Sequence, residues 1–115
     1  MKSNIQIVKP ITLEIEGFNY TLTFNRKSVV MAEQLGLKLA DIESAPMTTI
    51  PLLFFCSFLA NHPDMTRAKA DEIYFDKLGG LTADEIKRLG ELFVAPTQAL
   101  INEDGGERKN VKISL

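Results

Sequence analysis

The feature that most constrains the fold is an uninterrupted apolar run in the middle of the chain. Residues 50–60 read IPLLFFCSFLA, and at helical spacing this run puts large apolar side chains on both faces. Its eleven residues are too few for a membrane span, which needs about 18 or more. We therefore predict a helix over residues 49–61 that is buried all round. One small domain can hardly hide so much surface, so we expect part of this helix to meet another protein.

Composition restricts the class of protein. A chain of 115 residues, 45% apolar and 24% charged, suits one globular domain. A single Cys and a single His leave no intramolecular disulfide and no metal site built on these ligands. The net charge of −2 gives no bulk attraction to nucleic acid or to an anionic membrane. With no signal-peptide pattern at the N-terminus, we expect a reduced cytoplasmic protein.

Alternating residues near the N-terminus predict a β-hairpin. Residues 11–24 read ITLEIEGFNYTLTF, in which apolar residues recur at every second position in two runs, as in strands with one buried face. Gly17 and Asn19 lie between the runs and tolerate positive φ, which suits the turn.

Capping and termination signals predict about four helices after the hairpin. Asn25 is a good N-cap and Gly36 a good terminator for the first. Thr66 and the Thr82–Glu85 capping box begin two later helices, and Pro96 is expected to kink or divide the last. The predicted fold class is α+β, an N-terminal β-hairpin followed by a small bundle of about four helices. We expect one domain over residues 1–101 and a flexible polar tail over 102–115.

Cys56 and His62 are the first pair to test for nucleophilic catalysis. Six residues turn a helix by about 240°, so the two side chains should diverge. Cys56 stands among large apolar residues, where a thiol stays protonated and inert. The expected roles are a core position for Cys56 and a capping or surface position for His62. The carboxylates lack the spacing of a calcium loop, and Gly105–Gly106 do not match a phosphate loop, so we expect no enzyme activity, no cofactor and no metal.

Two phrases of the sequence resemble a known family. NRKSVVMAEQLG at 25–36 and TTIPLLFFCSFLANHPDMTRAKADEIYFDKLGGLT at 48–82, preceded by the hairpin, are similar to small tail assembly chaperones of long-tailed phages and prophages of Gram-positive bacteria. The resemblance covers about residues 11–100 and includes no catalytic motif. It implies a non-enzymatic protein that binds the tape measure protein and keeps it soluble during tail assembly. It also implies location in the bacterial host cytoplasm and absence from the mature virion.

Such a chaperone needs exposed apolar surface. The helix at 49–61 and the consecutive residues 92–94 offer more apolar positions than one core can face, because neighbouring residues on a helix point about 100° apart. The expected partners are the tape measure protein, the major tail protein and further copies of the chain, and no nucleic acid or membrane. The expected partner-binding residues are Phe55, Phe58, Leu59, Leu92 and Phe93. Two other functions stay open, a structural minor tail or head–tail component retained in the particle and a small DNA-binding regulator.

Overall fold

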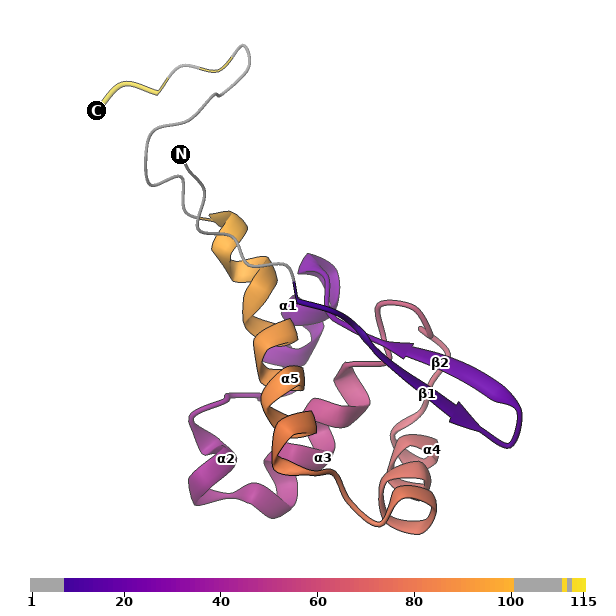
Figure 1. The fold of residues 1–115 in the computed structure, drawn as a ribbon. Coiled ribbons are helices and arrows are strands. Elements are labelled where there is room, and N and C mark those ends of the chain that lie inside the picture. Colours follow the sequence, from indigo (N-terminus) through magenta and orange to yellow (C-terminus); the bar gives the residue numbers. More distant parts are fainter. Residues whose placement is uncertain (1–7, 101–110, 112) are drawn as a thin grey trace.

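A computed structural model describes residues 8–100, 111 and 113–115 of the chain. It confirms the predicted α+β class, with a two-stranded antiparallel hairpin followed by helices (Figure 1). The elements in chain order are β1 (Ile11–Ile15), β2 (Phe18–Leu22), α1 (Arg26–Gln34), α2 (Asp41–Ser44), α3 (Pro46–Cys56), α4 (Arg67–Glu72), the π-helical η1 (Ile73–Leu78), α5 (Ala83–Val94) and the 3-10 helix η2 (Ala95–Leu100).

The hairpin closes through a two-residue turn at Glu16 and Gly17. Their φ angles of 52° and 80° are the positive values that a primed β-turn needs, and this turn matches the twist of the two strands. The predicted turn position is therefore right for Gly17. Asn19 instead lies within β2, opposite Glu14.

The outer edge of β2 is covered by the connection between α3 and α4. The backbone N–H of Thr21 donates to Nε2 of His62 at 3.0 Å, and the Asn61 side chain donates to the Thr21 carbonyl at 3.4 Å. The N–H of Thr23 donates to the carbonyl of Ser57 at 2.9 Å. These bonds satisfy backbone groups that an edge strand otherwise leaves without partners.

Local capping explains where α1 and α5 begin. The Asn25 side chain accepts from the Ser28 N–H at 2.8 Å, and the Ser28 hydroxyl accepts from the Asn25 N–H at 2.9 Å. Thr82 and Glu85 form the predicted capping box in the same way. At its other end α1 is followed by Gly36, whose φ of 92° is the positive value expected of a terminator.

The central helix α3 differs from the predicted bounds of 49–61. It begins at Pro46, where a proline is already shaped for the first helical position, so Pro51 lies inside the helix. It ends at Cys56, and the chain continues in tighter turns in which the N–H groups of Phe58 and Leu59 donate three residues back.

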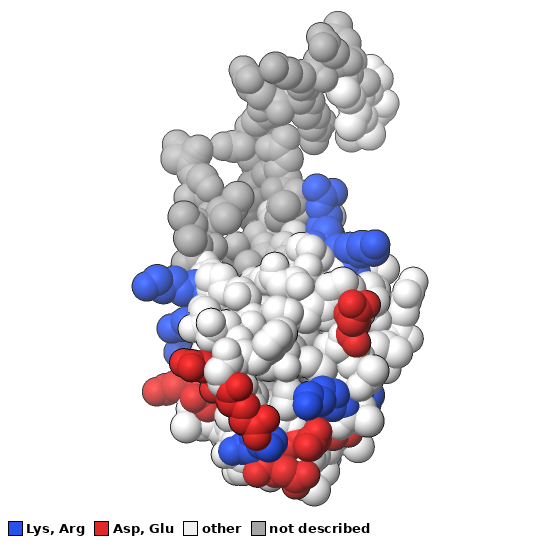
Figure 2. Space-filling view, turned by 90° about the vertical axis from the view of Figure 1, so that its right-hand side faces the viewer, with Lys and Arg blue, Asp and Glu red and all other residues white. Residues whose placement is uncertain are grey.

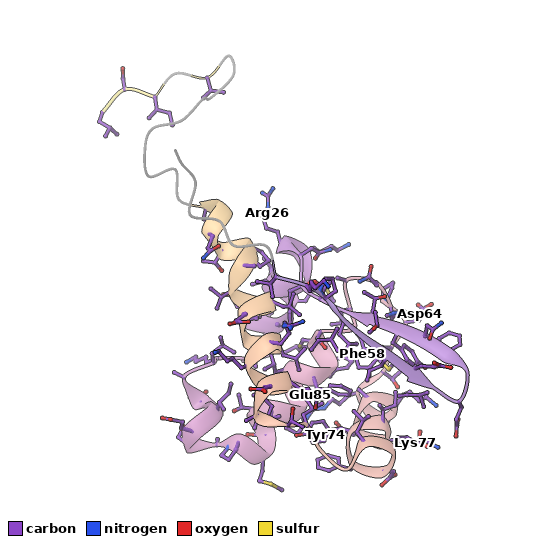
Figure 3. The ribbon with its side chains drawn as sticks, in the orientation of Figure 1. Arg26, Phe58, Asp64, Tyr74, Lys77 and Glu85 are labelled. Carbon is purple, nitrogen blue, oxygen red and sulfur yellow. The ribbon has the colours of Figure 1, made fainter. Side chains whose placement is uncertain are left out.

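Helix α3 is enclosed by the protein's own elements. It packs against α1, α2, α4 and α5, while the ring of Phe58 just beyond it lies 5.3 Å from that of Tyr20 in the hairpin (Figure 3). Leu53, Phe54 and Cys56 have no exposed surface. The expectation that part of this apolar surface meets another protein is therefore corrected for these positions, because one small chain surrounds the helix from several directions.

The last helical stretch changes character at Ala95, one residue before Pro96. There α5 gives way to η2, because proline lacks the N–H of an α-helical turn. The division of the last helix that Pro96 predicts is therefore observed, and Leu100 at the end of η2 is 71% exposed.

The chain beyond α1 turns back toward the core after Gly36. Leu35 is 54% exposed, whereas Leu37 beyond the Gly36 turn is buried. Arg88 of α5 donates to the carbonyl of Lys9 at 3.2 Å and so ties α5 to the segment before β1. Most of the predicted flexible tail, 102–115, lies outside the described residues. The tail residues that are described, 111 and 113–115, are exposed.

Among the described residues, no helix is both long and apolar enough to cross a membrane.

Candidate functional site

The structure buries most of the residues expected to bind a partner. Phe58 is completely buried, Leu92 and Phe93 are 3% and 8% exposed, and Leu59 is 9% exposed. Phe55 is partly buried and packs against the core. The expected assignment is corrected for the four buried residues, because they fill the core and offer almost no surface to a second protein.

Cys56 and His62 have separate structural roles. The Cys56 thiol has no exposed surface, which confirms the expected core position, and burial raises its pKa to about 11. The His62 imidazole accepts the Thr21 N–H and packs edge-on to the rings of Tyr20 and Phe58. Through this hydrogen bond and these ring contacts, His62 secures the edge of β2.

The buried thiol predicts a loss of stability at high pH. The folded protein holds the Cys56 proton up to a pKa of about 11, against an ordinary value of 9.0. Below pH 9 the thiol is protonated in both the folded and the unfolded chain. Above pH 9 the unfolded chain releases the thiol proton first, so the free energy of unfolding should fall as the pH rises. We expect a fall on the order of 2 kcal/mol between pH 9 and pH 11.

Urea unfolding of the native chain and of Cys56→Ala across this pH range measures the effect. Tyr74 and Lys77 also have raised pKa values, but they are present in both proteins, so the difference between the two curves reports on Cys56. Identical pH dependence in the two proteins would contradict the assignment. Rapid reaction of the native thiol with a maleimide would also contradict it.

Large apolar side chains are exposed at several other positions. In the helical part of the chain the exposed ones are Val30, Met31, Leu35, Met47, Phe75, Val94 and Leu100. Val94 alone among them lines a groove that the structure describes, at 43% exposure. The sequence argument that residues 92–94 cannot all face one core is thus confirmed, with Val94 as the one directed outward.

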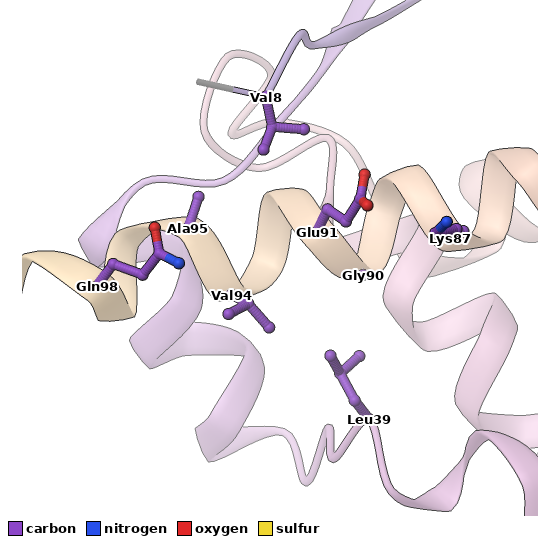
Figure 4. Close-up of a pocket in the computed structure, with 8 residues that line it drawn as sticks. All are labelled: Val8, Leu39, Lys87, Gly90, Glu91, Val94, Ala95 and Gln98. Carbon is purple, nitrogen blue, oxygen red and sulfur yellow. The ribbon is translucent and has the colours of Figure 1, made fainter. Parts of the chain in front are cut away.

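This α5 groove encloses about 320 Å³ along the outer face of α5 and the start of η2. Its floor residues follow the spacing i, i+3, i+4, i+7, i+8 and i+11, which is one continuous face of a helix. They are Lys87, Gly90, Glu91, Val94, Ala95 and Gln98. Val8 forms one wall, from the segment before β1, and Leu39 forms the other, from the segment before α2 (Figure 4).

Gly90 gives the α5 groove its depth. A glycine inside a helix costs about 1 kcal/mol relative to alanine, yet a Cβ placed there would meet only Cδ1 of Leu39, at an ordinary 3.9 Å. Packing within this chain therefore does not require glycine. The missing side chain leaves room for the backbone of another molecule to approach the helix.

A second groove lies beneath the tip of the hairpin and encloses about 510 Å³. Phe18, Tyr20 and Met65 contribute apolar surface, and the rings of Phe18 and Tyr20 are 4.9 Å apart. Near it, Lys77 of η1 donates to Glu16 of the turn at 2.8 Å, which lowers the pKa of Glu16 and raises that of Lys77. This groove is more polar than the first, because Asn61, His62, Asp64, Thr66 and Lys69 also line it.

Charges are mixed over the surface. The face shown in Figure 2 carries acidic and basic side chains next to one another in its lower part, with a wide uncharged area above them. In the α5 groove Lys87 and Glu91 stand one helical turn apart, so its floor has both signs of charge beside an apolar centre. Within the described part of the chain, no three His, Cys, Asp or Glu side chains gather closely enough to hold a metal ion.

Sequence reasoning missed Leu39 and Gly90 as lining residues of the α5 groove. Leu39 stands in a short segment between two helices and gives no signal in the sequence. Gly90 does give one, since it interrupts an otherwise good helical pattern at a position with no turn to make.

Comparison with known proteins places the chain in one family. No curated protein and no solved structure matches it. A family described as "Domain of unknown function (DUF5055)" matches residues 1–115. Since this match extends over the entire sequence, the chain belongs to the DUF5055 family.

Proposed function

We propose that this protein is a tail assembly chaperone of a phage or prophage, which binds the tape measure protein and keeps it soluble while the tail is built. The observation that carries the proposal is the α5 groove, a helix face with an apolar and small-residue centre between two apolar walls. The resemblance of residues 25–36 and 48–82 to tail assembly chaperones supports the same function.

A tape measure protein presents long amphipathic helices, and a groove recognises such a helix through its apolar face. Helices pack with axes about 8–10 Å apart, at the short end where small side chains lie at the contact. Gly90 and Ala95 supply small positions on the groove floor, and Val94 and Leu39 supply apolar contact. Beside the client's apolar face, Lys87 can pair with an acidic side chain of the client and Glu91 with a basic one.

The size of the groove suits a transient complex. About 320 Å³ is at the lower end of small ligand sites and accommodates only part of one helix face. Binding through such a surface is weak for each chain, so several chains along one client would act together. Weak individual contacts also allow the client to pass to the growing tail tube. A chaperone that releases its client in this way would act in the host cytoplasm and be absent from the finished particle.

The test is co-expression of the tape measure protein with and without this chain, with the soluble client measured after centrifugation. We expect the client to be soluble only with the chain present. Val94→Lys should lose this effect, because it places a charge at the centre of the groove floor. Met47→Lys is the matched control, since Met47 is 79% exposed and lies outside the groove.

Three outcomes would contradict the proposal. The client is equally soluble alone, Val94→Lys folds and protects as well as the native chain, or purified particles contain the protein in stoichiometric amounts. The last result would favour a structural minor tail or head–tail component. Salt-dependent binding to DNA in the absence of any client effect would favour a regulator.

A further inference from the structure

The edge of β1 that faces away from β2 has no partner strand among the described residues. Pairing of Ile15 with Phe18 across a two-residue turn makes them a hydrogen-bonded pair, as are Leu13 with Tyr20 and Ile11 with Leu22. The intervening residues of each strand then direct their backbone groups away from the partner strand. In β2 this is observed, because the Thr21 N–H and carbonyl bind His62 and Asn61.

The same alternation applies to β1, where Thr12 and Glu14 are the intervening residues. Their N–H and carbonyl groups point to the outer edge, and no described residue forms a hydrogen bond with them. The two edges of the hairpin therefore differ. One is covered by the α3–α4 connection, and the other offers four backbone groups over a length of five residues.

The C-terminal residues have the pattern of a matching strand. Residues 111–115 read VKISL, with apolar and polar residues in strict alternation over the same length as β1. Val111, Ile113 and Leu115 are 58%, 62% and 118% exposed, so these apolar side chains are mostly open to solvent. They end the chain far from the hairpin, at the upper left of Figure 1.

We propose that residues 111–115 of one copy of this chain add to the β1 edge of a second copy as an antiparallel third strand. Each chain carries both an acceptor edge that no described residue fills and an exposed apolar donor, and the described donor residues lie away from their own hairpin (Figure 1). The ten residues 101–110 can span up to about 36 Å, and a reciprocal exchange of strands between two copies is a low-cost route to a dimer.

Charge and side-chain placement select the register. With Ile113 opposite Leu13, the antiparallel register sets Val111 beside Ile15 and Leu115 beside Ile11. All three donor side chains then extend the face on which the β1 residues are partly buried against the core. On the opposite, solvent face this register brings Lys112 across from Glu14, a favourable cross-strand pair. The added strand donates and accepts through residues 112 and 114, which meet the free groups of Glu14 and Thr12.

The test measures the mass of the full chain by analytical ultracentrifugation over a range of concentrations. We expect a concentration-dependent dimer. Ile113→Asp should weaken it by about tenfold or more, because a carboxylate replaces the central buried side chain. Ser114→Asp is the matched control and should leave the dimer intact, since its side chain lies on the solvent face.

A second variant acts on the acceptor. Thr12→Pro removes an N–H that faces outward and takes no part in pairing with β2, so the hairpin should keep its fold while the edge loses a donor. Ile113→Asp and Thr12→Pro should each dimerise more weakly than the native chain when measured alone. Mixed together they should associate more strongly than either variant alone, because the first retains its acceptor edge and the second its donor strand.

Several results would overturn the inference. A native chain that is monomeric at every concentration excludes docking on a second copy. If Ile113→Asp also lowers the melting temperature of that monomer, the strand docks on its own chain. A dimer unaffected by Ile113→Asp uses another interface. None of these results depends on the tape measure protein, so they test the dimer separately from the proposed chaperone function.

Discussion

Phe58→Ala should cost about 3–5 kcal/mol of folding free energy. Phe58 has no exposed surface, and its ring packs edge-on at 5.0 Å to Phe54 and at 5.3 Å to Tyr20. It thereby joins the hairpin to the central helix (Figure 3). Truncation removes these contacts and leaves a cavity between the two parts of the fold, which would consume much of the stability of a small domain.

Urea unfolding followed by circular dichroism measures this cost, and Phe75→Ala is the matched control. Phe75 is 51% exposed and contacts the ring of Tyr74 at its outer side, so its truncation should cost less than about 1 kcal/mol. If Phe58→Ala is as stable as Phe75→Ala, Phe58 is not a core residue. Loss of chaperone activity in Phe58→Ala would reflect unfolding rather than a lost contact with the client.

Substitutions at Gly90 should change stability and client binding in opposite directions. Gly90→Ala should raise the free energy of unfolding by about 1 kcal/mol, because alanine favours the helix and its Cβ fits beside Leu39. Gly90→Leu adds a side chain that occupies the floor of the α5 groove. We expect client binding to fall progressively from glycine to alanine to leucine, with a loss of about tenfold or more for leucine.

Thermal unfolding of the chain alone and titration with a tape measure fragment give the two quantities. Thr48→Leu is the control, because it adds an exposed leucine to α3 outside the groove. Undiminished binding by Gly90→Leu would show that the client does not lie in the α5 groove. The co-expression test would then still decide whether the protein is a chaperone that uses another surface.

The α5 groove and the β1 edge lie on different elements and have different expected occupants. One is a side-chain surface suited to a helix, and the other is a backbone edge suited to a strand. Together they would let each chain bind a client through α5 and a second copy through β1. Val94→Lys and Ile113→Asp separate the two interactions, because each alters one surface and leaves the other unchanged.

Local physical chemistry was enough to predict the hairpin and three of the helix starts from the sequence, although not the bounds of α3. The alternation in residues 11–24 predicts two strands, and Gly17 marks their turn. Asn25, Thr66 and Thr82 mark three helix starts correctly, since a side chain that accepts from a backbone N–H three residues ahead acts within its own turn. The burial of Cys56 also followed from its immediate apolar neighbours.

Tertiary structure alone decided which apolar residues remain outside. Leu92 and Val94 are alike in sequence, yet one faces the core and the other lines a groove, because the rotation of α5 is set by what packs against it. Phe58 became a core residue because the hairpin, more than 30 positions earlier in the chain, folds over it. The α5 groove needs Val8 and Leu39 on either side of one helix, an arrangement of distant segments that hydrophobic spacing along any single element does not encode.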